Sequence, residues 1–355
     1  MRDFKVIGLM SGSSLDGVDI AYINFSHDNK KWFFQIIEAG NIPYTEDWKN
    51  KLSEAFNKNE SELKDLDIEY GKYLGTITKK FIKKYEFDPK LIASHGHTIF
   101  HSPEKAYTLQ IGNGQEIANA TGIMTINDFR TEDVKKGGQG APLVPIGDKY
   151  LFADFPICLN IGGIANVSYD IDGKRIAYDI CMANQMLNYL ANKLGYDYDN
   201  NGNFARQGNV DTNLLNIFND NSYYDKDAPK SLGREFFEKY QHEIIDNSTL
   251  PINDLLATAT EHIAYQIVKA TDSLEKSKIL ITGGGAKNNY LIERIRKMSK
   301  HEIVIPDTMI IDYKEALIFA FLGTLKMEGK INVLSSVTGA SSDSSSGNIC
   351  LPKQS

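Results

Sequence analysis

Three glycine-rich turns, each following an apolar run, contain the residue types in this chain that could do chemistry. The first lies at residues 8–19 (GLMSGSSLDGVD), between apolar runs at 4–9 and 18–25. Its glycines permit positive φ and close approach by a ligand, and its serine hydroxyls and amides could line an anion site. Asp16 and Asp19 would help to bind a phosphate only through a cation. Taken alone, the segment fits an ordinary hairpin turn equally well.

Two later segments repeat this design. They are residues 158–169 (CLNIGGIANVSY) and 278–289 (KILITGGGAKNN). None of the three contains the GxxxxGK[ST] motif of a P-loop, and none is a GxGxxG motif with a following helix and a distal acid. Two strand–turn–strand loops in successive halves, with a late Gly-Gly-Gly turn, suit a nucleotide held in a cleft between two related domains.

The elements that must position these turns occur twice along the chain. Strands are predicted at 4–10, 18–26 and 32–39, and again at 156–161, 165–170 and 174–179. Apolar residues at helical spacing predict helices at 61–85, from 256 to 274 and at 315–327. A meander followed by helices, occurring twice, indicates a duplicated α/β fold.

The composition fits a two-domain globular protein. The 355 residues exceed what one hydrophobic core usually covers, and 42% hydrophobic with 24% charged residues is ordinary for a globular chain. A formal net charge of −7 argues against a nucleic-acid partner, and no apolar run is long enough to cross a membrane. Met1 leads into a strand without a signal peptide, and the three cysteines have no paired spacing. We therefore expect a cytoplasmic protein without disulfides or a zinc site.

Further short motifs accompany the three turns along almost the whole chain. They are SHGHT at 94–98, LQIGNG at 109–114, NDFR at 127–130, GGQGAPLVP at 137–145, Asp179 with Asn184, KEA at 314–316 and SVTGAS at 336–341. With GLMSGSSLDGVD, LNIGGIANV at 159–167 and ITGGGAKN at 281–288, this series resembles the anhydro-N-acetylmuramic acid kinases. These are sugar kinases of the actin, hexokinase and Hsp70 superfamily.

The resemblance implies an α/β fold of two related ribonuclease H-like domains around a nucleotide cleft. We expect the first domain at 1–127, joined by the C-terminal segment 330–355, and the second at 128–329. The implied activity is an ATP-dependent kinase that opens the 1,6-anhydro bond of anhydro-N-acetylmuramic acid with water and phosphorylates O6. The product would be N-acetylmuramic acid 6-phosphate, in cell-wall (peptidoglycan) recycling. A homodimer is one option for its assembly that the sequence leaves open.

By resemblance, Asp179 is the catalytic base that activates the water. A carboxylate base is needed because water is a poor nucleophile at neutral pH. The sequence places Asp179 at the end of a predicted strand and before a helix that begins near Met182. From the sequence alone, a helix-capping role for Asp179 is slightly favoured, and the resemblance reverses that preference.

The resemblance also implies the groups that bind ATP and Mg²⁺. The nucleotide-binding residues would be Gly12, Ser13, Ser14, Leu15, Asp16, Gly17, Val18, Asp19, Asn160, Gly162, Gly163, Gly283, Gly284, Gly285 and Asn288. Asp16 would reach Mg²⁺ through water, and the last four residues would lie near the adenosine.

The sugar would be bound by Arg130, His97, Asn184 and Glu315. Arg130 has the planar donor fork that suits the lactyl carboxylate of a muramic sugar, but an ion pair with Asp128 or Glu132 is an equal alternative. Glu315 could accept hydrogen bonds from sugar hydroxyls or simply favour the start of its helix. A structural role is as plausible for His95 and His97 as contact with substrate.

Two departures from the family pattern bear on the substrate. Residues 179–184 read Asp-Ile-Cys-Met-Ala-Asn where the family usually has Asp-Thr-Gly-Pro-Gly-Asn, and His97 stands where it usually has Gln. They leave two alternatives: a kinase of the same fold for a different amino sugar, or a nucleotide-binding sensor without catalysis. Retention of Asp179 and Asp16 argues against the sensor. Cys181 has no evident base partner and is a weak candidate for a nucleophile.

Overall fold

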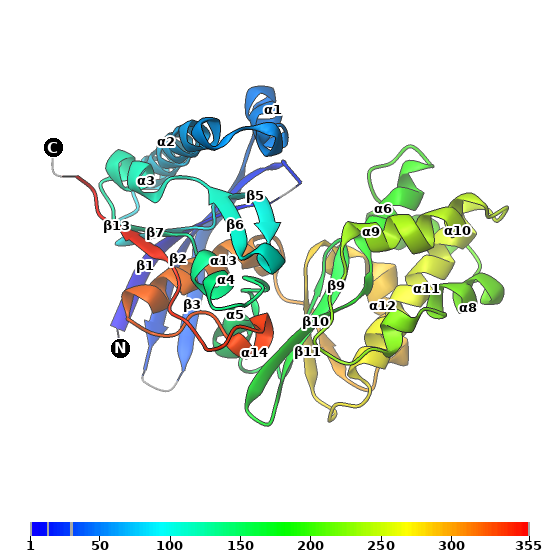
Figure 1. Cartoon of the computed structure of the whole chain (residues 1–355). Helices are drawn as coiled ribbons and strands as arrows, with labels where there is room; N and C mark the ends of the chain where they lie inside the picture. Colours follow the sequence, from blue (N-terminus) through cyan, green and yellow to red (C-terminus); the bar gives the residue numbers. More distant parts are fainter. Residues whose placement is uncertain (1, 13, 29–30, 354–355) are drawn as a thin grey trace. The chain divides into compact units, whose positions relative to one another are not determined.

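The computed structural model describes residues 2–12, 14–28 and 31–353. The chain divides into two compact units, one of residues 1–151 with 313–355 and the other of residues 152–312. Each unit has its own sheet and its own hydrophobic core (Figure 1). In the part of the chain that the structure describes, no helix is long and apolar enough to cross a lipid bilayer.

Unit 1 is built on a six-stranded sheet with the order β13-β7-β4-β1-β2-β3. Its strands are β1 (Arg2–Ser11), β2 (Gly17–His27), β3 (Trp32–Pro43), β4 (Leu91–Ser94), β7 (Thr125–Asn127) and β13 (Asn348–Cys350). The first three form an antiparallel meander, while β4 runs parallel to β1 and β7 parallel to β4. The hairpin of β5 (His97–Ser102) and β6 (Tyr107–Ile111) forms a separate two-stranded sheet.

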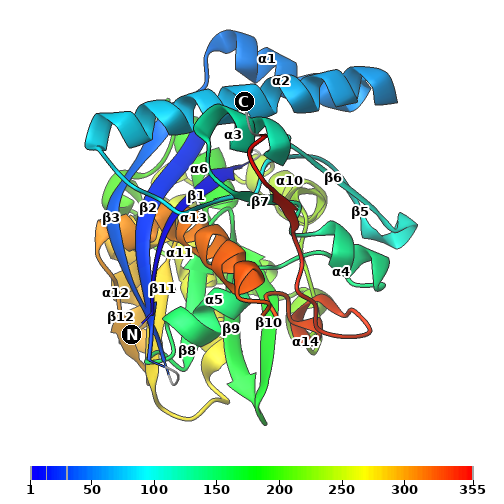
Figure 2. The same cartoon turned by 90° about the vertical axis from the view of Figure 1, so that its left-hand side faces the viewer.

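Helices cover both faces of this sheet (Figure 2). They are α1 (Glu46–Ser53), α2 (Glu60–Tyr85), α3 (Gly114–Thr121), α4 (Thr131–Lys135), α5 (Pro145–Leu151), α13 (Thr308–Met327) and α14 (Ser335–Thr338), with short 3₁₀ turns at Ala55–Asn57 and Pro103–Lys105. A capping box of Asn59 and Glu62 begins α2, and the apolar stripe of α2 packs on the face of β1 that carries Ile7 and Leu9. Because strand side chains alternate, Gly8 lies on the opposite face, against α13.

Unit 2 has a five-stranded sheet with the order β10-β9-β8-β11-β12. Its strands are β8 (Ile157–Ile161), β9 (Ile164–Ile171), β10 (Lys174–Met182), β11 (Lys278–Thr282) and β12 (Glu302–Val304). Its helices are α6 (Asn184–Asn192), α7 (Asn203–Gln207), α8 (Thr212–Asn219), α9 (Arg234–Phe236), α10 (His242–Asp246), α11 (Ile252–Thr271) and α12 (Asn289–Met298), with 3₁₀ turns at Asn200–Gly202, Ser222–Asp225 and Gly284–Lys287 and a π-helical turn at Phe237–Gln241.

The two sheets share one plan, a ribonuclease H-like strand order. In each, an antiparallel meander supplies three strands, the fourth strand runs parallel to the first, and the fifth runs parallel to the fourth. This repeat confirms the predicted fold class of two related α/β domains.

The compact units differ from the predicted domains in two segments. Residues 128–151 and 313–329, expected in the second domain, belong to unit 1. Within unit 1, the Lys314 ammonium of α13 lies 2.7 Å from the Asp148 carboxylate of α5, with both side chains buried. A Cβ on Gly147 would lie 2.6 Å from Ile318, so α5 and α13 are also closely packed. The pairing of β13 with β7 holds the C-terminal segment on the same sheet.

The fit between β1 and α13 gives a test of the unit 1 fold. A Cβ on Gly8 would lie 2.0 Å from the carbonyl oxygen of Ala316, a distance that no relaxation of a side chain can relieve. We expect Gly8→Ala to destabilise unit 1 by about 1–3 kcal/mol, as overpacked cores are. Gly40→Ala is the matched control on the same sheet, because nothing lies within 4 Å of its Cβ. Equal urea midpoints for the two variants would contradict this packing.

Candidate active site

In unit 1, the turn that joins β1 to β2 forms the first predicted phosphate loop. Leu15 has φ of 59° and Gly17 has φ of 156°. A Cβ on Gly17 would lie 2.4 Å from the carbonyl oxygen of Ile42, so only glycine fits there. Ser14 and Asp16 are exposed on this turn and Gly12 is half-buried, whereas Ser13 lies outside the described residues.

The end of this loop returns to the sheet. The Val18 side chain is fully buried in the core, so Val18 presents only its backbone to a ligand. Asp19 is half-buried, and its Oδ1 accepts a hydrogen bond of 2.8 Å from Asn41 Nδ2. Nucleotide binding by this loop stays a prediction.

A buried chain of hydrogen bonds fixes the last residue before the loop. Ser11 Oγ lies 2.6 Å from the Tyr44 hydroxyl and 2.8 Å from His97 Nδ1, and the Tyr44 hydroxyl also bonds the Tyr70 hydroxyl. All four side chains are no more than 5% exposed. Burial lowers the pKa of His97 to about 4, so its ring is neutral at neutral pH. His97 is therefore tied to the loop through Ser11, and its contact with substrate stays a prediction.

His95 and Arg130 form a second polar cluster at the carboxyl ends of β4 and β7. Burial, with the nearby Arg130 charge, holds the pKa of His95 well below its usual value. Neutral His95 can donate from Nδ1 to the Gly96 carbonyl (3.0 Å) and accept at Nε2 from Arg130 Nε (3.1 Å) and Nη2 (2.9 Å). Arg130 Nη1 donates to the carbonyl oxygen of Gly140 at 2.6 Å. Among the described residues, Arg130 forms no ion pair with Asp128 or Glu132, so neither proposed pair is present.

These bonds leave Arg130 equipped to bind an anion. They use three of its five N–H donors and leave one on each terminal nitrogen, the arrangement that a bidentate carboxylate requires. The guanidinium is half-buried, and desolvation lowers the pKa of Arg130 to about 10, which keeps it charged at neutral pH.

Glu315 lies in α13, where the close packing of α13 on Gly8 positions it beside β1. Desolvation raises the pKa of Glu315, while Arg130 opposes the shift and the Asp19 charge adds to it. The charges of Glu315, Arg130 and Asp19 therefore interact within unit 1. α13 begins at Thr308 but is kinked at Tyr313, so Glu315 lies in the first turn of the helical segment that follows the kink. Both roles considered for Glu315, contact with the sugar and a favourable position at a helix start, stay predictions.

In unit 2, the candidate base Asp179 lies within β10, at a bulge in its pairing with β9. Its Oδ2 accepts a hydrogen bond of 2.9 Å from the Leu232 amide, and its own amide donates to the Lys230 carbonyl at 3.2 Å. The Tyr223 hydroxyl donates to the Asp179 carbonyl at 2.6 Å. Desolvation raises the pKa of Asp179, although the Leu232 amide opposes the shift. The capping alternative is wrong, since Ala183 is the N-cap of α6 and has no side-chain bond there.

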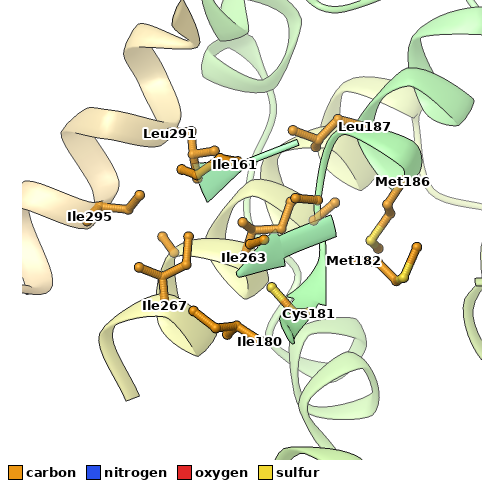
Figure 3. Packing of buried hydrophobic residues seen from close by; sticks show 14 of the residues in the cluster. Ile161, Ile180, Cys181, Met182, Met186, Leu187, Ile263, Ile267, Leu291 and Ile295 are labelled. Atoms are coloured by element: carbon orange, nitrogen blue, oxygen red, sulfur yellow. The ribbon is translucent and has the colours of Figure 1, made fainter. Parts of the chain in front are cut away.

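The departure from the family pattern after Asp179 lies in the core of unit 2. Ile180, Cys181, Met182 and Ala183 are all no more than 3% exposed. Figure 3 shows the first three among Ile263, Ile267 and Met186. Burial raises the pKa of the Cys181 thiol strongly, so Cys181 is a core residue and not a nucleophile.

The second and third glycine turns meet at one end of the unit 2 sheet. A Cβ on Gly283, which has φ of +81°, would lie 2.6 Å from Asn160 Oδ1, and one on Gly285 would lie 2.2 Å from Ile161. The hairpin turn at Gly162 and Gly163 is bonded to the first residues of α6: the amide of Ala183 donates to Gly163 and that of Asn184 to Gly162.

The side chains around these turns have partners of their own. Asn184 Nδ2 donates to the Ile161 carbonyl at 3.1 Å, and Asn288 Oδ1 caps α12 by accepting from the Leu291 amide at 3.0 Å. Gly284 is exposed between them, 3.5 Å from Asn184 Nδ2 at its Cβ position. The structure thus gathers Asn160, Gly162, Gly163, Gly283, Gly284, Gly285 and Asn184 in unit 2, while their ligand contacts stay predictions.

Several residues that support these sites have contacts that their sequence motifs do not predict. Ser11 was expected only to help line an anion site, whereas its hydroxyl bonds Tyr44 and His97, and Tyr44 and Tyr70 are far from it in the chain. Tyr223 and Leu232 belong to a segment without any motif. Only contacts between distant segments identify them.

The donor set around Asp16 fits Mg²⁺ held by nucleotide phosphates and not a metal cage. Within the described residues there is no group of three or more His, Cys, Asp or Glu side chains that could hold an ion. Mg²⁺ in kinases needs only one or two carboxylates, because phosphates and waters supply its other ligands. An exposed Asp16 beside a glycine loop meets that requirement.

Comparison with known proteins decides the family. Residues 4–352 match the family model described as anhydro-N-acetylmuramic acid kinase. The chain belongs to this family. The anhydro-N-acetylmuramic acid kinase of Pasteurella multocida is 35% identical, with 98% of this chain and 97% of the relative aligned. That of Haemophilus influenzae is 34% identical, with 98% of each chain aligned.

Similarity to solved structures is weaker. The activator of 2-hydroxyisocaproyl-CoA dehydratase from Clostridium difficile, with bound ADPNP, is 14% identical at a TM-score of 0.46, over 92% of this chain and 96% of that one. At that level it supports no argument about this chain.

The buried chain at Ser11 predicts a measurable stability. Tyr44→Phe removes the hydroxyl that joins Ser11 to Tyr70 and leaves their buried polar atoms short of a partner. We expect a loss of about 1–3 kcal/mol in the free energy of unfolding of unit 1. Tyr73→Phe is the control, because Tyr73 contacts Tyr44 and Trp48 through its ring and has no hydroxyl bond within the described residues. Equal losses in chemical denaturation of the two variants would contradict the role of the chain.

Proposed function

We propose that this protein is an ATP-dependent kinase that opens the 1,6-anhydro bond of anhydro-N-acetylmuramic acid and phosphorylates O6. The observation that carries the proposal is the family match across residues 4–352. The product, N-acetylmuramic acid 6-phosphate, assigns the enzyme to cell-wall recycling. Since the reaction uses ATP, we place it in the cytoplasm.

Asp179 would be the base for the hydrolytic half of the reaction. A water attacks C1 and gives its proton to Asp179 while the C1–O6 bond breaks. The released O6 attacks the γ-phosphorus of ATP, and ADP leaves. A carboxylate with a raised pKa is a stronger base than an ordinary one at neutral pH. The Leu232 amide holds Oδ2, and Oδ1 has no hydrogen-bond donor among the described residues, so it is the oxygen that can take the proton.

Arg130 would recognise what distinguishes a muramic sugar from glucosamine, its lactyl carboxylate. The two N–H groups left on the terminal nitrogens of Arg130 form a fork of the right geometry, and His95 and the Gly140 carbonyl hold that fork in place. Glu315, near Arg130, would accept hydrogen bonds from sugar hydroxyls.

The glycine turns would bind ATP. The loop at 12–19 would bind phosphates, Asn160, Gly162 and Gly163 would form a second phosphate loop, and the turn at 283–285 with Asn288 would lie near the adenosine. Mg²⁺, held by the phosphates with Asp16 through water, would offset charge on the transferring phosphoryl group.

The burial of residues 180–183 supports anhydro-N-acetylmuramic acid as the substrate in preference to a different sugar. That alternative rested mainly on residues 180–183, and these are core residues of unit 2. The sensor alternative gains no support either, because a sensor has no use for a desolvated carboxylate in the position of the base.

The proposal predicts which sugars release ADP from ATP. Anhydro-N-acetylmuramic acid should support turnover. The sugar 1,6-anhydro-N-acetylglucosamine, which lacks the lactyl group, should support it poorly, and reducing N-acetylmuramic acid should not support it.

The same assay tests two variants. Asp179→Asn should lower turnover by about 10²–10⁴-fold with ATP affinity retained. Arg130→Lys should reduce the preference for the lactyl sugar. Release of ADP by none of the sugars would contradict the proposal.

The raised pKa of Asp179 predicts the acid limb of the pH profile. Asp179 must be ionised to act, and a raised pKa means that the protonated form persists to higher pH than for a free carboxyl of pKa 3.8. We therefore expect kcat/KM to decrease as the pH is lowered, and the midpoint of this decrease to lie above pH 3.8. Glu315, whose pKa is also raised, is the control: Glu315→Gln should keep the limb if Asp179 produces it. If Glu315→Gln abolished the acid limb, the limb would come from Glu315 and the prediction for Asp179 would be wrong.

A further inference from the structure

Two motifs of the sequence have no part in the proposed chemistry: GGQGAPLVP at 137–145 and SVTGAS at 336–341. Both belong to unit 1, and the structure joins them, because the amide of Gln139 donates to the carbonyl oxygen of Thr338 at 2.8 Å. The carboxylate of Asp133, in α4, forms hydrogen bonds to both motifs. Through these bonds the two motifs are connected to Arg130.

Asp133 is fully buried, and one motif satisfies each of its carboxylate oxygens. Oδ1 accepts from the Thr338 hydroxyl at 2.7 Å, and Oδ2 accepts from the Gly140 amide at 2.8 Å. Among the residues that the structure describes, Asp133 forms no ion pair. Its carboxylate is therefore held by hydrogen bonds, and the removal of one donor would leave a buried oxygen without a partner, which is unfavourable enough to shift the group.

The loop at 137–140 fits closely around this carboxylate. A Cβ on Gly138 would lie 2.2 Å from Asp133 Oδ2, so any side chain at position 138 would displace the carboxylate. Gly140 has φ of 65°, and a Cβ there would lie 2.8 Å from Val134 Cγ2. The two glycines thus let the loop pass close to α4 and place the Gly140 amide on Asp133.

Gly140 connects the Asp133 carboxylate to the Arg130 guanidinium. Its amide donates to Asp133, and its carbonyl oxygen accepts from Arg130 Nη1 at 2.6 Å. His95 Nε2 accepts from the other two nitrogens, Nε and Nη2. The guanidinium is therefore held at two points, and one of them depends on Asp133 and Thr338.

We propose that Asp133 and Thr338 are positioning residues for recognition of the lactyl carboxylate. They hold Gly140, and Gly140 sets the angle at which Arg130 presents its two remaining N–H groups. This inference rests on the proposed function, which assigns the lactyl carboxylate to Arg130. A bidentate contact requires both N–H groups to meet the two carboxylate oxygens at once, so a small tilt of the guanidinium weakens it.

A role in the stability of unit 1 alone predicts a different result. If Asp133 and Thr338 only stabilised the fold, their loss would weaken the binding of a sugar with a carboxylate and of one without it equally. If they set the angle of Arg130, their loss would weaken only the binding of the carboxylate.

Calorimetric titration of the full chain with anhydro-N-acetylmuramic acid and with its lactyl methyl ester separates these roles, because the ester is the same sugar without the negative charge. We expect the wild type to bind the acid about tenfold more tightly than the ester. Thr338→Val, which keeps the shape and removes the hydroxyl, should lose most of this preference and keep the affinity for the ester. Thr338→Ser, which retains a hydroxyl, should keep the preference.

Two further variants complete the experiment. Gly138→Ala displaces the same carboxylate without altering Thr338, and it should also lose the preference. Thr78→Val is the matched control, because Thr78 is fully buried in α2 and its hydroxyl donates to the Leu74 carbonyl of the same helix at 2.7 Å. Circular dichroism checks that each variant is folded. In turnover of the acid, Thr338→Val should raise KM for the sugar and leave kcat unchanged.

Retention of the full preference by both Thr338→Val and Gly138→Ala would overturn the inference, and so would an equal loss of affinity for the acid and the ester. Equal binding of acid and ester by the wild type would overturn the role of Arg130 in the proposed function, and this inference with it. A preference for the acid in a wild type that releases no ADP would count against the proposed reaction and not against the positioning of Arg130.

Discussion

The partial burial of the Asp179 carboxylate is the constraint on which the proposed chemistry depends. A fully solvated carboxylate is a weak base, and one satisfied by several donors is weaker still. Here burial raises the pKa while only one amide, that of Leu232, opposes the rise. The segment that supplies this amide is held to β10 by Tyr223 and Lys230. Most polar contacts of Asp179 are therefore to its backbone, and Oδ1 has no donor among the described residues, which suits the proposed attack by water.

In unit 1, too, some polar side chains hold in place the residues that are proposed to bind ligands. Its polar side chains near the loop serve mainly to hold other groups: Ser11 is fixed by Tyr44 and His97, and Arg130 is oriented by neutral His95. Neutral histidines suit this role because they add no charge to a region where Arg130, Glu315 and Asp19 already interact. Glycine at position 8 admits α13, so one missing Cβ helps to position Glu315.

Much of the fold followed from the sequence because its signals were local. The helix at 61–85 has a capping box and a continuous apolar stripe, and the observed α2 differs by one residue. Boundaries set by contacts between distant segments were harder. Residues 313–329 belong to unit 1 because Lys314 pairs with Asp148 and Ile318 packs on Gly147. The periodicity of the sequence does not reveal these contacts. Likewise, residues 180–183 suggested an altered substrate site, but their apolar character is explained by the core that β10 enters.

The most direct test of the account is the fate of a water oxygen. With anhydro-N-acetylmuramic acid and ATP in ¹⁸O-labelled water, Asp179 as the base for attack on C1 predicts label at C1 of the first-formed product, read before the anomers exchange. The bridging oxygen should remain on C6 and carry the phosphate. A product without label at C1, or label that appears in inorganic phosphate while the sugar stays closed, would contradict the account.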